Sequence, residues 1–170
     1  MKQYAIDVYL SSGGHPSDLA ADKPSNFAEH VQLQELGIAA ESISFANVTL
    51  ESEKYVCVRE SGESVNSVAI VDLNNIHNMV RRPMSADSAI MNPEKNILAL
   101  KLQRQLQVFN LETKAKLKSH MSPQDVIYWR WISATVLGIV TTSSVYHWSI
   151  EDDAAPQKVF DRHALTHRHI

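Results

Sequence analysis

The sequence predicts an all-β protein made of short antiparallel strands, and the β-propeller is the favoured architecture. From residue 42 onward, apolar runs rich in Val, Ile, Tyr, Phe and Trp alternate with polar turns, a pattern typical of strands. Groups of four such runs then recur at a spacing of roughly 40 residues, as the four-stranded blades of a propeller do. An antiparallel sandwich is the alternative, but its architecture gives no reason for a repeat.

The predicted strands follow one another closely along the chain. In order they are 43–49, 54–60, 67–73, 78–82, 87–91, 96–102, 105–111, 114–118, 126–132, 135–141, 144–149 and 157–160. The repeat is clearest in 68–73, 106–111 and 145–150, at offsets of 38 and 39 residues, and each copy ends with a small polar turn-former and an aliphatic residue. The first strand of each group is expected at 43–45, 89–91 and 126–131. Three blades do not close a ring, so an incomplete ring, assembly with other chains or an exposed sheet edge is expected.

Composition narrows the possible functions. The chain has 170 residues, of which 44% are apolar, so it is not a disordered chain. Its net charge of −3 argues against general nucleic-acid binding, which needs a basic surface. The single cysteine, Cys57, forms no internal disulfide and fits a reducing compartment. We find neither a secretory signal nor an apolar run of membrane-spanning length, so contact with a membrane is expected only through partners.

Long blocks of the sequence resemble the beginning of clathrin heavy chains. These blocks are 26–38, 51–60, 81–93, 107–118, 128–132, 145–149 and 160–163. The block Arg81–Pro93 and the run Val145–Ser149 are long enough to be specific. The resemblance extends over residues 26–163, whereas 1–25 and 164–170 depart from the family pattern.

The resemblance implies about the first three blades of a seven-bladed ring, preceded by a short irregular extension. Residues 1–25 are expected to be a divergent, disordered extension, with a short strand over 1–10 as the alternative; 26–163 are the partial propeller and 164–170 a divergent tail. The chain would then be a truncated form of the family. The alternative to a functional segment is a truncated fragment that does not fold stably alone.

The implied function is that of a structural coat protein of clathrin-coated pits and vesicles. The family's propeller binds clathrin-box peptides of adaptor proteins during vesicle-mediated transport and endocytosis. Its full-length members form heavy-chain trimers and bind clathrin light chains. The expected location is the cytoplasmic face of coated pits and vesicles at the plasma membrane, trans-Golgi network and endosomes. Neither a cofactor nor a metal is expected, and the sequence contains no P-loop or Gly-x-Ser-x-Gly elbow that would indicate an enzyme.

The resemblance places a peptide groove between the first two blades. The matching positions are Arg82, Leu98, Gln105, Gln107, Phe109, Lys114 and Lys116. Gln105 stands where the family has a small hydroxyl residue, a difference that would alter peptide preference.

The residues themselves predict a compatible surface. Strand alternation puts Gln105, Gln107 and Phe109 on one face, opposite Leu106 and Val108. The same argument predicts a shared face for the next strand's lysines and a basic region around the groove: Lys114, Lys116 and Lys118 in the strand, with Arg81, Arg82, Lys101 and Arg104 nearby. In the competing interpretation, Phe109 is ordinary core between blades and the lysines are a solvated edge.

Other residues have weaker support from the sequence as functional sites. Phe45 matches one residue of a second family pocket at the top of the propeller, and ordinary core is its alternative. Trp129 and Trp131 share a face. They could form a stacking platform for nucleic acid or sugar, but we favour packing between blades. His163, His167 and His169 have a spacing that could gather a metal, but the sequence shows no carboxylate or supporting shell beside them. Cys57 lies between valines, which predicts a buried, inert thiol.

Overall fold

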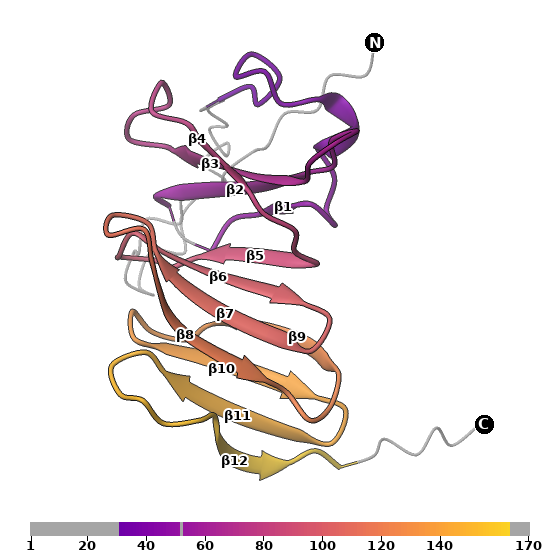
Figure 1. Cartoon of the computed structure of the whole chain (residues 1–170), viewed down its shortest axis with the longest axis vertical. Helices are drawn as coiled ribbons and strands as arrows, with labels where there is room; N and C mark the ends of the chain where they lie inside the picture. The colour runs from indigo at the N-terminus through magenta and orange to yellow at the C-terminus, as the bar shows by residue number, and fades with distance from the viewer. Residues whose placement is uncertain (1–30, 52, 164–170) are drawn as a thin grey trace, which may run out of the picture.

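The computed structural model describes residues 31–51 and 53–163, which form three four-stranded antiparallel sheets (Figure 1). The first sheet contains β1 (Val48–Thr49), β2 (Tyr55–Glu60), β3 (Ser67–Asp72) and β4 (Val80–Pro83). The second contains β5 (Ser88–Met91), β6 (Ile97–Leu102), β7 (Gln105–Asn110) and β8 (Ala115–Met121). The third contains β9 (Val126–Trp131), β10 (Val136–Thr141), β11 (Ser144–Ser149) and β12 (Gln157–Asp161). Within the described residues, the only helical element is the 3₁₀ turn η1 (Ala40–Ser42), and no helix there has the length and apolar character to span a bilayer.

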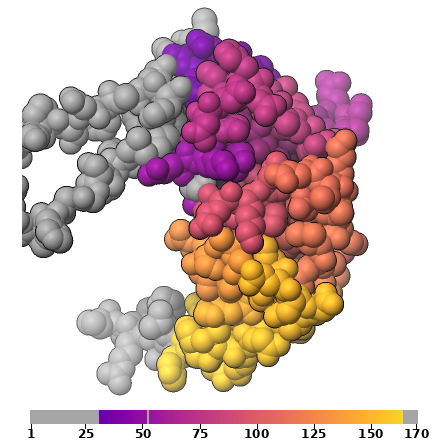
Figure 2. Space-filling model, turned by 90° about the vertical axis from the view of Figure 1, so that its left-hand side faces the viewer, coloured from indigo at the N-terminus to yellow at the C-terminus, as the bar shows by residue number. Residues whose placement is uncertain are grey.

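The sheets are stacked face to face in the order of the chain, and Figure 2 shows them as one continuous body. We call the contact between the first and second sheets the first interface, and that between the second and third sheets the second interface. The first is filled by a buried cluster that includes Cys57, Val68 and Leu98. The second is filled by a larger cluster that includes Trp131 and Trp148. Both faces of the second sheet are therefore buried, as expected of a blade inside a propeller.

The segment before β1 differs from the prediction. A strand over 43–49 was expected, but only Val48–Thr49 pair with β2, and 44–47 form a turn. The preceding chain folds back over the free face of the first sheet, where Leu33 and Ile38 are each 2% exposed. Ile43 joins this packing instead of extending the strand, because burying its side chain there removes apolar surface from water.

The predicted turn-formers have a common physical role. Asp72, Asn110 and Ser149 end β3, β7 and β11, and each accepts a hydrogen bond from the backbone N–H two residues later. The donor–acceptor distances are 2.9, 2.9 and 3.1 Å. A side-chain acceptor at this point stabilises the chain reversal that follows the strand. The sequence repeat at 38 and 39 residues therefore corresponds to the same side-chain-stabilised turn in each of the three sheets.

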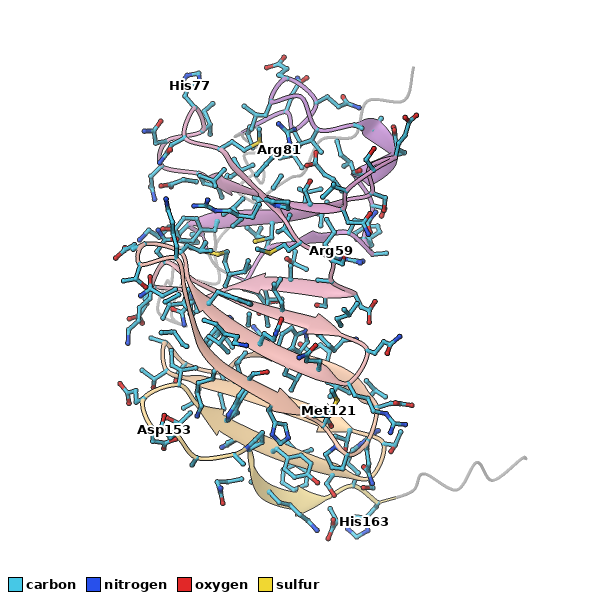
Figure 3. All side chains as sticks on the ribbon, in the orientation of Figure 1. Arg59, His77, Arg81, Met121, Asp153 and His163 are labelled. Atoms are coloured by element: carbon cyan, nitrogen blue, oxygen red, sulfur yellow. The ribbon has the colours of Figure 1, made fainter. Side chains whose placement is uncertain are left out.

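Side chains also join neighbouring sheets. The indole Nε1 of Trp129 donates to Ser88 Oγ at 3.0 Å, and Nε1 of Trp131 donates to the Ile90 carbonyl at 3.4 Å. At the first interface, Arg59 Nη1 donates to the Ala86 carbonyl at 3.0 Å, and Figure 3 shows Arg59 at this junction. These bonds satisfy polar groups that stacking would otherwise leave without partners.

The all-β class and the sheet-by-sheet repeat are confirmed, and three antiparallel four-stranded sheets agree with propeller blades. Closure into a seven-bladed ring stays a prediction. The expected extension over 1–25 and the tail over 164–170 lie outside the described residues, as do His167 and His169.

Candidate functional site

Three of the predicted groove residues form a row across the second sheet. Leu98 of β6 lies directly opposite Phe109 of β7, and Phe109 lies opposite Lys116 of β8. Directly opposite residues in an antiparallel pair present their side chains on the same face. Because Leu98 is fully buried in the first interface, the whole row faces the first sheet. Phe109 is half-buried against the same cluster, and Lys116 is exposed at its edge.

The two glutamines lie in adjacent rows on the same face. Gln107 pairs with Leu100, and Gln105 pairs with Leu102. Both glutamines are half-buried, whereas Leu106 between them is fully buried on the opposite face. The predicted alternation of β7 is therefore confirmed, and it brings two amide groups and one aromatic ring to the first interface.

The first sheet contributes Arg82 to this interface. Arg82 of β4 lies opposite Val68 of β3, whose buried side chain packs in the same cluster as Leu98. Arg82 is consequently on the face of the first sheet that is turned toward the second. The structure thus brings Arg82 to the same side as the row that contains Phe109 and Lys116.

Lys114 is placed differently. It is exposed in the turn between β7 and β8, with φ of 55° in the left-handed region. Asn110 Oδ1 accepts hydrogen bonds from the backbone N–H groups of Glu112 and Thr113 at 2.9 and 3.0 Å, which fixes the turn. Lys114 therefore lies at the end of the groove and not on a strand face.

The prediction that Lys114, Lys116 and Lys118 share a face is wrong. The β7–β8 register shifts between Val108 and Phe109, so that Phe109 pairs with Lys116 but Val108 pairs with Lys118. Leu117 is the extra residue of this bulge, and a bulge of one residue turns the following side chains to the other face. Lys118 consequently enters the second interface, where its Nζ donates to the carbonyls of Ser149, Asp152 and Ala154 at 2.7, 2.6 and 2.8 Å.

The predicted basic region is also smaller than expected. Arg81 faces away from the groove and pairs with Glu60, with 2.9 Å between Nε and Oε2; Figure 3 shows it on the first sheet. Lys101 lies opposite Leu106, on the face turned toward the third sheet, and Arg104 pairs with Asp125 at 2.7 Å. Among the described residues, the groove cations Arg82, Lys114 and Lys116 have no ion-pair partner.

A hollow beside Gln105 was not predicted. It has a volume of about 480 Å³ and is lined by Leu102 and Met121 together with the Arg104–Asp125 pair. Leu102 is 42% exposed and Met121 is 63% exposed. The predicted strand ended at residue 118, whereas β8 continues to Met121 and pairs it with Gln105. The signal that was missed is the apolar Met121 three residues beyond the predicted end.

Sequence comparison identifies the relatives of this chain. It matches no protein-family model. It is 52% identical over 141 residues to "Clathrin heavy chain" of Drosophila melanogaster, which covers 83% of this chain and 8% of the relative. It is 55% identical over 146 residues to "Probable clathrin heavy chain" of Schizosaccharomyces pombe, covering 86% and 9%. The chain is a homologue of clathrin heavy chains. The predicted resemblance is therefore confirmed. The chain spans less than a tenth of the length of these relatives.

In this clathrin heavy-chain homologue, the second-pocket candidate Phe45 is fully exposed in the turn before β1. Its alternative interpretation as plain core is therefore wrong. The predicted packing role of Trp129 and Trp131 is confirmed, because they are 6% and 4% exposed at the second interface. Rings this deeply buried leave no face free for stacking on a base or sugar.

The remaining candidates of this clathrin heavy-chain homologue are not assembled into a site. Cys57 is 1% exposed, and burial is the main cause that raises its thiol pKa to about 12. A thiol with that pKa stays protonated and unreactive at neutral pH. His163 is exposed, and within residues 31–51 and 53–163 no three His, Cys, Asp or Glu side chains are gathered for a metal.

Proposed function

We propose that this chain is a segment of a clathrin-type coat protein that binds extended, apolar and acidic peptides of adaptor proteins at the first interface. The observation that carries the proposal is the convergence of six side chains from two sheets on one interface. They are Arg82, Leu98, Gln105, Gln107, Phe109 and Lys116.

Each group at the interface suits one part of such a peptide. The glutamine amides offer donors and acceptors to an extended backbone, and the half-buried ring of Phe109 offers an apolar surface. The unpaired cations attract acidic side chains and raise the rate of encounter more than the final affinity. One peptide bound to one groove is held weakly, so multivalency in an assembled coat would make the binding effective.

The location and the further partners are part of the same proposal. A chain that binds adaptors in this way acts at the cytoplasmic face of coated pits and vesicles, and its contact with the membrane is indirect. Heavy-chain trimers and light chains are partners proposed for the whole protein. The mechanism needs neither a cofactor nor an enzymatic step. Homology over most of the chain does not favour the alternative of a non-functional product.

The test is a titration of the purified 170-residue chain with a fluorescent clathrin-box peptide beside a scrambled peptide of equal composition. We expect saturable binding of the first peptide only, weakened by salt because the cations are exposed. The double variant Lys114→Ala/Lys116→Ala should weaken binding by about tenfold, or roughly 1.4 kcal/mol. Lys158→Ala, which removes a cation of the third sheet, is the matched control.

Two results would contradict the proposal. One is equal peptide affinity of the wild type and a folded Lys114→Ala/Lys116→Ala variant. That result would show that these cations do not contribute to binding. The other is no peptide binding by a chain whose circular dichroism and protease resistance show that it is folded. An unfolded spectrum together with rapid digestion would support the alternative, in which the fragment does not fold stably alone.

A further inference from the structure

A cavity of about 160 Å³ lies at the second interface, away from the groove at the first interface. Its wall on the second sheet includes Leu106 and His120, which are directly opposite each other on β7 and β8. Its wall on the third sheet includes Ile139 and Tyr146, which are directly opposite each other on β10 and β11. Two cross-strand pairs that face each other across the interface therefore form two walls of the cavity.

The internal repeat relates this cavity to the first interface. Val68 and Leu106 are equivalent in the repeat, and the residues opposite them on the outer strands are Arg82 and His120. On the facing sheets, Gln107 and Tyr146 are equivalent at an offset of 39 residues. The second interface thus has an imidazole where the first has a guanidinium, and a phenol where the first has an amide.

The lining of the cavity is apolar and carries no available charge. Ser122 and Thr141 are buried and already donate to the carbonyls of Gln124 and Ser144, at 2.6 and 3.0 Å. Lys118, the nearest cation on β8, is held by three carbonyls and by Asp152, 3.5 Å away. Burial, and then the charge of Lys118, lower the pKa of His120, so the imidazole is neutral at neutral pH.

Two polar groups at the cavity have no hydrogen-bond partner among the described residues. They are the His120 imidazole, whose only ring contact is with Trp148 at 5.9 Å between centroids, and the Tyr146 hydroxyl. An apolar cavity with a few polar groups at its edge that are free to bond a ligand is the usual form of a ligand site. A volume of this order accommodates a ring of benzene size.

We propose that the second interface is a separate docking groove, which takes one aromatic or leucine-sized side chain of an extended, uncharged partner peptide. The side chain fills the cavity, and the imidazole of His120 and the hydroxyl of Tyr146 hydrogen-bond to the peptide backbone. Because no unpaired cation lies in the lining, the groove does not select acidic residues, in contrast with the first interface. The proposal uses a different pair of sheets and does not depend on adaptor binding at Phe109.

The test is methyl NMR of the 170-residue chain with labelled Ile and Leu, titrated with the capped pentapeptide Ala-Ala-Phe-Ala-Ala. We expect saturable shifts of the Ile139 and Leu106 methyl resonances, with a dissociation constant that changes less than about twofold when salt is raised. His120→Trp, which fills the cavity from its edge, should weaken binding by about tenfold or more. Tyr146→Phe, which removes only the hydroxyl, should weaken it by about threefold. Arg82→Ala is the matched control at the first interface and should leave the affinity within about twofold.

Three results would overturn the proposal. The first is a shift of the Leu98 methyls that Arg82→Ala abolishes, since the probe would then occupy the first interface. The second is a dispersed spectrum in which the Ile139 and Leu106 methyls do not respond to the peptide, or respond equally in wild type and Tyr146→Phe. The third is an undispersed spectrum without binding, because the cavity would then not exist in this protein.

Discussion

The two interfaces are built from equivalent strands but are closed to different extents. The second is filled by three tryptophans, Trp129, Trp131 and Trp148, each at most 6% exposed. At the first interface, the residue equivalent to Trp148 is Phe109, which is only half-buried. The second interface therefore buries more aromatic surface than the first, where the ring of Phe109 stays partly accessible.

The lysines of β8 sharpen this difference. Lys116 is exposed beside the first interface, and Lys118, two residues later, is inserted into the second with 9% of its side chain accessible. The bulge at Leu117 separates their roles. One inserted residue thus places one lysine in solvent and the next in the packing between sheets.

The largest expected effect comes from truncating the equivalent aromatic residues. Trp148→Ala should reduce the free energy of unfolding by about 3–5 kcal/mol, because the ring is 1% exposed and its Nε1 donates to the Ala154 carbonyl at 3.2 Å. Phe109→Ala should cost about half as much, since its ring is only half-buried. Urea denaturation of both variants measures the difference. Equal losses would mean that the two interfaces are closed alike.

The next effect compares the two lysines. Lys118→Ala should destabilise the fold by about 2–3 kcal/mol, because three carbonyls lose a charged donor. Lys116→Ala should change the free energy of unfolding by less than about 0.5 kcal/mol, as expected of an exposed side chain. Lys118→Met keeps the apolar stem and serves as a control for lost packing. Denaturation curves that do not separate Lys118→Ala from Lys116→Ala would argue against the inserted position of Lys118.

A smaller effect concerns the pH dependence of the second interface. The folded-state pKa of His120 is lowered by burial first and by the Lys118 charge second, so the unfolded chain binds this proton more readily. His120 should therefore contribute stability above its ordinary pKa of about 6.5 and lose it as the pH falls from that value through the folded-state pKa. NMR titration of the His120 ring gives the folded-state pKa directly. Lys118→Met should raise it, and an unchanged value in that variant would exclude the electrostatic cause.

The smallest expected effect concerns the reactivity of the Cys57 thiol, which is buried at the first interface. Cys57, with a thiol pKa raised to about 12 chiefly by burial, should not react with a thiol reagent at pH 8 while the chain is folded. It should react fully in denaturant, and Phe109→Ala should speed the reaction in water by opening its own interface. Trp148→Ala, at the other interface, is the comparison. Rapid labelling of the folded wild type would show that the first interface opens without global unfolding.

Strand positions and the faces of β7 were predictable because they depend on local alternation. The apolar pattern places Gln105, Gln107 and Phe109 together without knowledge of the neighbouring sheet. The path before β1 was not predictable in the same way. Ile43 and Phe45 look alike in a strand pattern, yet Ile43 packs over the first sheet and Phe45 is exposed, because tertiary burial overrides local propensity.

The candidate site shows the same limit. The sequence contains the lysines of the groove, but alternation alone assigns Lys118 to the wrong face. A bulge leaves no reliable mark in one sequence, since it depends on how β8 pairs with β7. The ion pairs that neutralise Arg81 and Arg104 involve Glu60 and Asp125, each 21 residues away from its partner, and only the fold brings them together.

The turns made by Asp72, Asn110 and Ser149 have a consequence for how the chain acquires its structure. Among residues 31–51 and 53–163, each strand pairs only with strands adjacent to it in sequence, and these turns are stabilised by residues two positions apart. Pairing of this kind has a low contact order, so each hairpin forms without waiting for distant parts of the chain. During translation, one sheet can complete its hydrogen bonds before the strands of the next have left the ribosome. Each newly formed sheet can then pack on the apolar face of the sheet that was completed before it.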